Sequence, residues 1–346
     1  MKNAKFLLSL WIVMIALPSC DKKDGPIRPP DAHRAVIGNE GAFGHENAEL
    51  TMVNLSDGTV EQNAYALSNG GAPLGDVLHS MTRVGDEIFL IVNNSAKVEV
   101  VNAYTLERKR VIAISGSSPR YMLSLSANKA YVSDLYESGI HIIDPSTGGY
   151  SGLLDLGVSA EQMLLHDGKV YATCPMADSL VVIDPHTDEV IGGVGLSIGV
   201  DDLRIDKNGL LWTMADGNWD GSAEPAVDVV DPITLERVKS FEFSAGTGYN
   251  GVLELSPDGA TAYLLAGGDI YRMDITADTL PASPWITGDG RNFYAMISDP
   301  DTGELWVTDA ADFTQNGKVY SFNSHGQITA TYAAGIAPKS AVWVSE

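Results

Sequence analysis

The feature that most constrains the fold is a repeat that recurs along almost the whole chain. Seven times, a β-rich run ends in an apolar residue followed by Asp or Asn, at Val53-Asn54, Val101-Asn102, Ile143-Asp144, Ile183-Asp184, Val230-Asp231, Met273-Asp274 and Phe322-Asn323. Successive Asp/Asn positions are 48, 42, 40, 47, 43 and 49 residues apart. This spacing, filled by short strands, is typical of four-stranded propeller blades. The sequence therefore predicts an all-β fold, a seven-bladed β-propeller.

The third and fourth repeats each contain four strand-like segments. These are 119–125, 129–134, 139–144 and 150–156 in the third repeat, and 161–166, 169–174, 179–184 and 189–195 in the fourth. The third segment of each is apolar nearly throughout, as expected when both faces of a strand contact neighbouring blades. The Asp or Asn that follows is predicted to form a turn.

The two ends of the repeat region complement each other. Segment 34–38 resembles a second strand, and 50–54 and 60–67 follow as a third and an outer strand, but no inner strand precedes them. Segment 340–344 has the pattern of an inner strand and no blade of its own. We therefore expect the C-terminal strand to complete blade 1 and close the ring, which removes free sheet edges.

The net charge of the 346-residue chain argues against one class of partner. With 22 Lys and Arg against 45 Asp and Glu, the formal charge is −23. A chain with so few cations has little with which to neutralise phosphates, so we expect no nucleic-acid partner. An acidic, soluble surface is the simpler reading of this charge.

The N-terminus has the pattern of an export signal. Lys2 and Lys5 precede the apolar run 6–17, and Leu17-Pro18-Ser19-Cys20 resembles a bacterial lipobox. We predict a lipoprotein signal peptide (1–19), a lipidated Cys20 that begins a flexible tether (20–32), and a propeller domain (33–346). The alternative is an ordinary cleaved signal with an incidental cysteine. Acyl chains on Cys20 would anchor the protein to the outer membrane, most simply at the cell surface, with the periplasmic face left open. Cys174 lies in a strand-like run and is expected to be a buried thiol.

Loops that lead into first strands, and loops that join second to third strands, lie on one face of a propeller around the central channel. In this chain they combine aromatic rings with amides and carboxylates, a mixture that suits a polar organic ligand. The predicted ligand-binding residues are Phe43, Asn47, Arg120, Tyr121, Tyr136, Asp202, Asn218, Trp219, Tyr249, Asn250, Asn292, Tyr294 and Phe313. Four aromatics (Phe43, Tyr136, Trp219, Phe313) are expected to stack on the ligand, and Asn47, Asn218, Asn250 and Asn292 to hydrogen-bond it. The alternative for each aromatic is packing within its own loop.

Motifs for catalysis or metal binding are weaker. Asp216, Asn218 and Asp220 match the first half of a calcium loop, but its twelfth position is Val227 instead of Glu. The histidines lack metal-ligand spacing, and no nucleophile elbow is present. We therefore predict no catalytic residue and no cofactor, and favour a binding protein over an enzyme. Two alternatives stay open: a calcium-dependent lactonase or lyase that uses Glu40, Asp202 and Asp216, and a scaffold that docks another surface protein.

Two segments carry a family likeness. Residues 39–50 (NEGAFGHENAEL) and 309–320 (DAADFTQNGKVY), with Gly326 and Pro338 after them, resemble the opening and closing blades of YncE-like surface lipoproteins of Bacteroidota, of the BtuG and DUF5074 type. The resemblance implies a lipid-anchored seven-bladed propeller that captures a small nutrient. In the BtuG branch the nutrient is cobalamin, which is handed to a TonB-dependent outer-membrane transporter. We therefore expect a capture protein with a cobalamin-type corrinoid as the first ligand to test.

Overall fold

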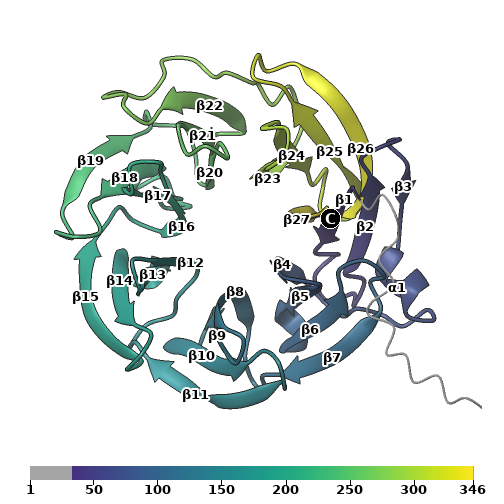
Figure 1. Cartoon of the computed structure of the whole chain (residues 1–346). Helices are drawn as coiled ribbons and strands as arrows, with labels where there is room; N and C mark the ends of the chain where they lie inside the picture. The colour runs from purple at the N-terminus through teal and green to yellow at the C-terminus, as the bar shows by residue number, and fades with distance from the viewer. Residues whose placement is uncertain (1–32, 346) are drawn as a thin grey trace, which may run out of the picture.

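A ring of seven antiparallel sheets forms the protein, and the computed structural model describes residues 33–345 of it (Figure 1). Blade 1 pairs β27 (Pro338–Val344), β1 (Arg34–Asn39), β2 (Glu49–Asn54) and β3 (Val60–Glu61). Blade 2 contains β4 (Leu78–Val84), β5 (Glu87–Val92), β6 (Lys97–Asn102) and β7 (Arg108–Ala113). Blade 3 contains β8 (Pro119–Ser126), β9 (Lys129–Asp134), β10 (Gly139–Asp144) and β11 (Gly149–Asp155). Blade 4 contains β12 (Met163–His166), β13 (Lys169–Cys174), β14 (Ser179–Asp184) and β15 (Glu189–Gly195).

The remaining three blades continue around the ring in chain order. Blade 5 contains β16 (Val200–Ile205), β17 (Leu211–Ala215), β18 (Ala226–Val230) and β19 (Arg237–Glu242). Blade 6 contains β20 (Gly251–Leu255), β21 (Thr261–Ala266) and β22 (Asp269–Asp274). Blade 7 contains β23 (Phe293–Ser298), β24 (Leu305–Asp309), β25 (Asn316–Phe322) and β26 (Ile328–Ile336). The predicted seven-bladed propeller is confirmed.

The C-terminal strand closes the ring as expected. β27 runs antiparallel to β1, with Ala35 opposite Trp343 and Ile37 opposite Ala341. On its other side β1 pairs with β2, so the beginning and the end of the described chain share one sheet. Val342 and Val344 are buried in the apolar layer between blades 1 and 2. Closure therefore supplies both backbone pairing and apolar packing.

All seven Asp or Asn markers of the repeat act as turn formers. In each blade the side-chain oxygen of the marker accepts a hydrogen bond from the backbone N–H two residues later, at 2.7–2.9 Å. This local bond replaces the backbone pairing that ends with the third strand. The repeat that reveals the fold in the sequence is therefore a repeat of turns.

Segment 60–67 departs from the predicted outer strand. Only Val60–Glu61 pairs as β3, and a short helix, α1 (Ala64–Ser68), follows. The carboxylate of Glu49 accepts hydrogen bonds from the N–H groups of Tyr65 and Ala66. Because the first N–H groups of a helix lack partners inside the helix, this carboxylate stabilises the turn. Tyr65 is fully buried against blade 2, which fixes the helix in place.

Blade 6 has three paired strands instead of the predicted four. After β22 the chain continues through residues 275–292, where Ile286 forms an isolated bridge to Ile270. This stretch contains Pro281 and Pro284, which have no N–H to donate to a sheet. The missing outer strand is consistent with that loss of donors.

Apolar layers between successive blades form the core. One layer joins blades 5 and 6 through Trp212, Met214, Leu253 and Leu264. Cys174 is fully buried in the corresponding layer between blades 3 and 4, as predicted, and burial raises the pKa of its thiol to about 12. No helix within residues 33–345 has the length and apolar character needed to cross a membrane. The predicted signal peptide, Cys20 and tether lie outside the described residues.

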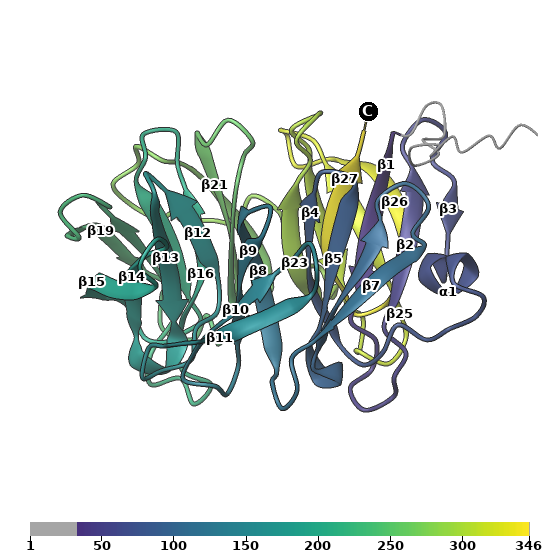
Figure 2. The ribbon, with the colours of Figure 1, turned by 60° about the horizontal axis from the view of Figure 1, so that its bottom comes forward.

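The antiparallel order fixes which loops share an end of the ring. Within each blade, the loop into the first strand and the loop between the second and third strands lie at the same end, which we call the pocket end. Figure 2 shows the blades from the side, with their strands spanning the two layers of loops. β1 is a second strand, so it runs towards the pocket end, and its first residue, Arg34, lies at the opposite end.

We predict that truncation before Pro338, which removes β27, abolishes cooperative unfolding. The change exposes the edge of β1 and removes Val342 and Val344 from the core. Truncation after Val344 keeps the whole strand and serves as the matched control. Circular dichroism during thermal unfolding checks both variants. A cooperative transition near that of the full chain in the shorter variant would show that closure is dispensable.

Candidate functional site

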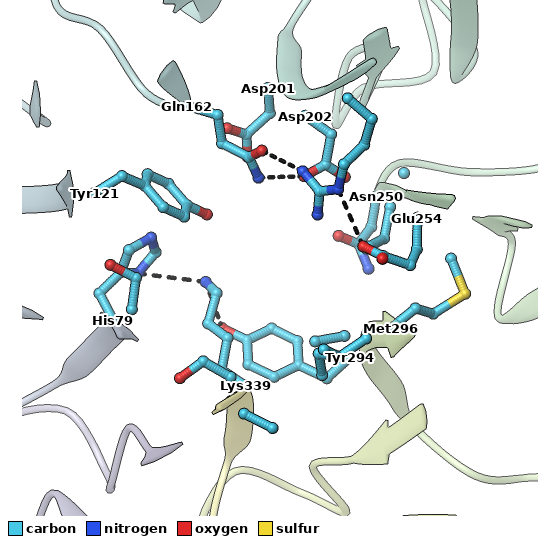
Figure 3. A pocket seen from close by; sticks show the side chains of 18 of the residues that line it. His79, Tyr121, Gln162, Asp201, Asp202, Asn250, Glu254, Tyr294, Met296 and Lys339 are labelled. Atoms are coloured by element: carbon cyan, nitrogen blue, oxygen red, sulfur yellow. Dashed lines mark hydrogen bonds and ion pairs between the residues drawn. The ribbon is translucent and has the colours of Figure 1, made fainter. Parts of the chain in front are cut away.

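A cavity of about 230 Å³ lies where the first strands begin, at the pocket end of the central channel (Figure 3). Every blade contributes to it. Gln162 comes from the loop into β12, and six first strands supply His79, Tyr121, Asp202, Glu254, Tyr294 and Lys339. Because each side chain comes from a different blade, the cavity exists only when the ring is closed.

One side of the cavity is organised around the buried carboxylate of Glu40. Its Oε1 lies 3.3 Å from Lys339 Nζ and 3.4 Å from His79 Nδ1, and its Oε2 accepts a hydrogen bond of 2.8 Å from the Tyr294 hydroxyl. Burial opposes ionisation of Glu40, but Lys339 and His79 outweigh it and lower the pKa of Glu40 to about 2. Burial, with Lys339 and Arg120 nearby, holds the pKa of His79 well below its ordinary value, so this ring is neutral at pH 7.

The two arginines at the cavity each have an acidic partner. Arg120 Nε lies 2.8 Å from Glu161 Oε1, and Arg204 Nε lies 3.0 Å from Glu254 Oε2. Burial disfavours the charge of Arg120, but Glu161 more than compensates and raises its pKa above the ordinary value. Gln162 accepts a hydrogen bond of 2.6 Å from Arg204 Nη1 and donates its amide N–H to Asp202. Each of these guanidinium groups is thus held in place and its charge is matched.

Three aspartates of blade 5 face the same cavity without such a match. Within residues 33–345, no salt bridge joins Asp201, Asp202 or Asp216 to a cation. Asp202 accepts a hydrogen bond of 2.6 Å from Leu253 N, and Asp216 accepts one of 2.8 Å from Gly251 N. Burial raises the pKa of Asp202 to about 7, with Arg204 opposing the rise and Asp201 adding to it. Burial and the neighbouring Asp201 likewise raise the pKa of Asp216 to about 6.

Glu161 has a raised pKa despite its arginine partner. Burial is the main cause, the charge of Asp201 adds to it, and Arg120 opposes both, which leaves the pKa at about 7. The cavity therefore holds carboxyl groups that take up protons close to neutral pH. Groups perturbed in this way are concentrated at functional sites.

Exposed apolar side chains surround the cavity at the pocket end. Six blades contribute at least one, from loops between second and third strands or from loops into first strands: Phe43, Tyr136, Met176, Ile198, Trp219, Tyr249 and Phe313. Trp219 is 86% exposed. Exposed apolar side chains gathered at one end of a molecule are a feature of interaction sites, whereas scattered ones are ordinary. We call these seven residues the apolar rim.

The predicted ligand-binding residues divide between the cavity and the loops around it. Tyr121, Asp202, Asn250 and Tyr294 line the cavity, and Arg120 adjoins it through its contact with His79. Phe43, Tyr136, Trp219, Tyr249 and Phe313 belong to the apolar rim. Phe313 also packs edge-on against Tyr294, with ring centres 5.0 Å apart, so one rim aromatic contacts the cavity wall.

The three remaining asparagines hydrogen-bond within their own surroundings. Asn47 accepts from Ala42 N at 2.8 Å, Asn218 donates to Ser222 Oγ at 2.7 Å, and Asn292 donates to Ala311 O at 3.0 Å. These amides shape the loops that carry the rim.

The predicted set lacks most of the other residues that line the cavity, among them His79, Gln162, Arg204, Glu254 and Lys339. Most lie inside first strands, where a polar side chain looks structural. Their spacing nevertheless follows the repeat, because hydrogen bonds between neighbouring blades join residues 40 or 41 positions apart, as in Arg120–His79 and Gln162–Asp202. Polar residues at repeat spacing within otherwise apolar first strands are the signal that could have identified them.

The alternative of a calcium site at Asp216, Asn218 and Asp220 has little support from the geometry of these side chains. Asp216 bonds to Gly251 N, whereas Asn218 and Asp220 bond to Ser222 within their own loop. Across residues 33–345, no three His, Cys, Asp or Glu side chains gather in an arrangement that could hold a metal ion.

A comparison with protein families matches residues 35–336 to DUF5074, a domain of unknown function. The chain belongs to the DUF5074 family. The match includes strands of all seven blades, ends before β27, and agrees with the DUF5074 type expected from the two terminal motifs. A search of curated proteins found no match.

Solved structures similar to this DUF5074 protein share its fold at low identity. A quinonprotein alcohol dehydrogenase-like protein from Bacteroides thetaiotaomicron has a TM-score of 0.69 and 17% identity, over 90% of this chain and 78% of that one. A putative 6-phosphogluconolactonase from Bacteroides fragilis has a TM-score of 0.66 and 13% identity, over 91% of this chain and 99% of that one. The periplasmic gluconolactonase of Pseudomonas aeruginosa has a TM-score of 0.68 and 13% identity, over 90% of this chain and 99% of that one. Identities this low establish the architecture alone.

We predict that the free energy of unfolding falls by about 1.5 kcal/mol between pH 6.5 and pH 8 because of the cavity carboxyls. Glu161 and Asp202 have pKa values of about 7 in the folded chain, so the folded state holds protons there that the unfolded state has already released. Stability is then lost as the pH rises through 7. The pKa of His79 is lowered in the folded chain, so this residue makes the free energy of unfolding fall as the pH drops below about 6.5, the ordinary pKa of histidine. Its effect therefore lies mainly below this window.

Urea unfolding at four pH values in this window measures the slope. Asp202→Asn should remove about half of it, whereas Asp167→Asn, at an exposed turn at the opposite end of the ring, should leave it unchanged. A flat profile in the unmodified chain would contradict the raised pKa values.

Proposed function

We propose that the protein captures a small nutrient molecule at the pocket end without changing it chemically. The observation that carries this proposal is the apolar rim surrounding a polar cavity to which all seven blades contribute. Flat apolar surface binds the body of a ligand, and a few placed polar groups fix its orientation. A rigid ring of strands also needs little ordering on binding, which favours affinity.

The size of the cavity limits how a large ligand would bind. Its volume of about 230 Å³ is below the ~300–1,000 Å³ of pockets that enclose drug-sized ligands. A macrocycle would therefore lie across the apolar rim and insert only a side arm. A corrinoid, which has a flat ring with amide-bearing arms, is the first candidate. The resemblance of the two terminal motifs to the BtuG type supports the same choice.

The proposed setting follows from the N-terminal motif. Lipidation at Cys20 would anchor the protein to the outer membrane, most simply at the cell surface. The proposed partner is a TonB-dependent transporter that receives the captured nutrient. The DUF5074 match and the resemblance to surface lipoproteins of Bacteroidota are the grounds for this setting.

Titration of the purified full chain with cyanocobalamin tests the ligand. We expect calorimetric binding at micromolar concentration or tighter. Trp219→Ala should weaken it by about tenfold, because an anchoring aromatic contributes on the order of 1–2 kcal/mol when it packs against a ligand.

The matched control for Trp219→Ala is Ile233→Ala. Ile233 is equally exposed but lies in a turn between β18 and β19, at the end opposite the pocket, and should leave affinity unchanged. Absence of heat at micromolar concentration would rule out the corrinoid. Equal losses from both variants would rule out the rim as the binding surface.

A second candidate function is hydrolysis of a lactone or related ester. The pKa values of about 7 at Glu161 and Asp202 favour it, because a carboxyl group that titrates near neutral pH can take and return a proton during hydrolysis. Two similar solved structures are named gluconolactonases, which adds an analogy at the level of the fold.

Hydrolysis of glucono-1,5-lactone by the full chain, with calcium or with a chelator, discriminates this candidate. An enzyme should exceed the spontaneous rate, and Asp202→Asn should reduce that excess by about 100-fold. The exposed-site variant Asp167→Asn should retain it. A rate equal to the spontaneous one under both conditions would reject lactonase activity.

A further inference from the structure

Charge pairing divides the cavity into two unlike walls. On the wall formed by blades 1, 2 and 7, Lys339, His79 and Tyr294 surround Glu40, so that the charge of Lys339 is compensated. On the blade 5 wall, Asp201 and Asp202 stand across the opening from Lys339 and Tyr294, with Tyr121 at the side between them (Figure 3).

The blade 5 wall carries more acidic groups than cations, since Arg204 stands there with Asp201, Asp202 and Asp216. Glu40, Glu161 and Glu254 pair with Lys339, Arg120 and Arg204, respectively. Asp201, Asp202 and Asp216 then remain without a salt-bridge partner in the described part of the chain. Buried carboxylates without cations are costly unless they are protonated or a ligand brings the missing positive charge.

Unpartnered atoms provide an independent indication of a ligand. Asp201 Oδ1 is buried with no hydrogen-bond partner within residues 33–345, and so are His79 Nε2 and Ser340 Oγ. All three residues line the cavity, and His79 is only 1% exposed. Buried polar atoms are almost always satisfied in folded proteins, so three exceptions around one cavity indicate groups that a ligand or water completes.

The two walls specify what that ligand offers. The blade 5 wall suits a positively charged donor, whereas His79 and Ser340 on the other side suit neutral polar groups such as hydroxyls. The ring of Tyr121 stands between the walls, and aromatic faces attract cations and pack against sugar-like rings. A bare metal ion fits poorly, because the three aspartates do not converge in a metal-binding arrangement among the described residues.

We infer that the cavity binds a small hydroxylated organic cation, a primary ammonium compound of the amino-sugar or amino-alcohol class. The ammonium group lies against Asp201, Asp202 and Asp216, and its hydroxyl oxygens face His79 and Ser340. A cavity of about 230 Å³ accommodates a single sugar ring. The inference rests on the proposed function, since it names the chemical group that the capture site selects.

Glucosamine and glucose provide the matched pair of probes, because they differ by one ammonium in place of one hydroxyl. Calorimetry with the purified full chain at pH 7 should show glucosamine binding at least about tenfold more tightly than glucose, since hydrogen bonds to charged groups contribute more than neutral ones. Asp201→Asn should reduce this preference, because it weakens the binding of glucosamine more than that of glucose. Asp216→Asn provides a second variant of the same wall, and Asp167→Asn is the control at the opposite end of the ring.

Equal affinities for the two sugars, absence of binding by both, or an undiminished preference in both Asp201→Asn and Asp216→Asn would overturn the inference. Circular dichroism of each variant verifies that the ring remains folded. Cyanocobalamin titrated into the same preparations separates the two proposals. Corrinoid binding without an ammonium preference contradicts the inference alone, whereas an ammonium preference without corrinoid binding contradicts only the choice of corrinoid.

Discussion

The pairing of β27 with β1 is the interaction on which the rest of the structure depends. It joins residues about three hundred positions apart and leaves β1 paired on both sides in blade 1. The same strand carries Lys339, whose ammonium group reaches Glu40 at the end of β1. Backbone closure and assembly of the charged cavity are therefore one event. An open ring would lose the cavity together with its stability.

Charge placement in the channel shows how a strongly acidic chain tolerates buried ions. The glutamates at the channel have cationic partners, Glu40 within blade 1 and Glu161 and Glu254 from the neighbouring blade, which offsets much of their desolvation. The aspartates of blade 5 rely on backbone N–H groups and one amide instead. This contrast gives the cavity an electrostatic direction, with matched charge on one side and excess negative charge on the other. An uneven distribution of charge of this kind favours one orientation of a polar molecule in a cavity.

The sequence predicted those features whose stabilising contacts are made between residues close together in the chain. The markers Asn54 to Asn323 were recognisable because each makes its turn bond two residues away. Segment 60–67 was misassigned because the carboxylate that stabilises α1 comes from Glu49, which precedes the helix by a whole strand and turn. His79 and Lys339 were left out of the predicted site for a similar reason, since their role comes from contacts with Glu40, which is distant from both in the sequence. Loop positions alone did place Tyr121, Asp202, Asn250 and Tyr294 at the cavity.

The direction of β1 determines how an attached protein would present itself. Arg34 begins that strand at the end away from the cavity, and β27 also finishes at that end. A lipid tether joined there would place the end opposite the pocket next to the bilayer. The pocket end would then face away from the membrane. A ligand could then reach the cavity directly from the medium. Transfer to a transporter in the membrane would require the ring to reorient, or part of the transporter to extend to the pocket end. Tether length would thus govern delivery more than uptake.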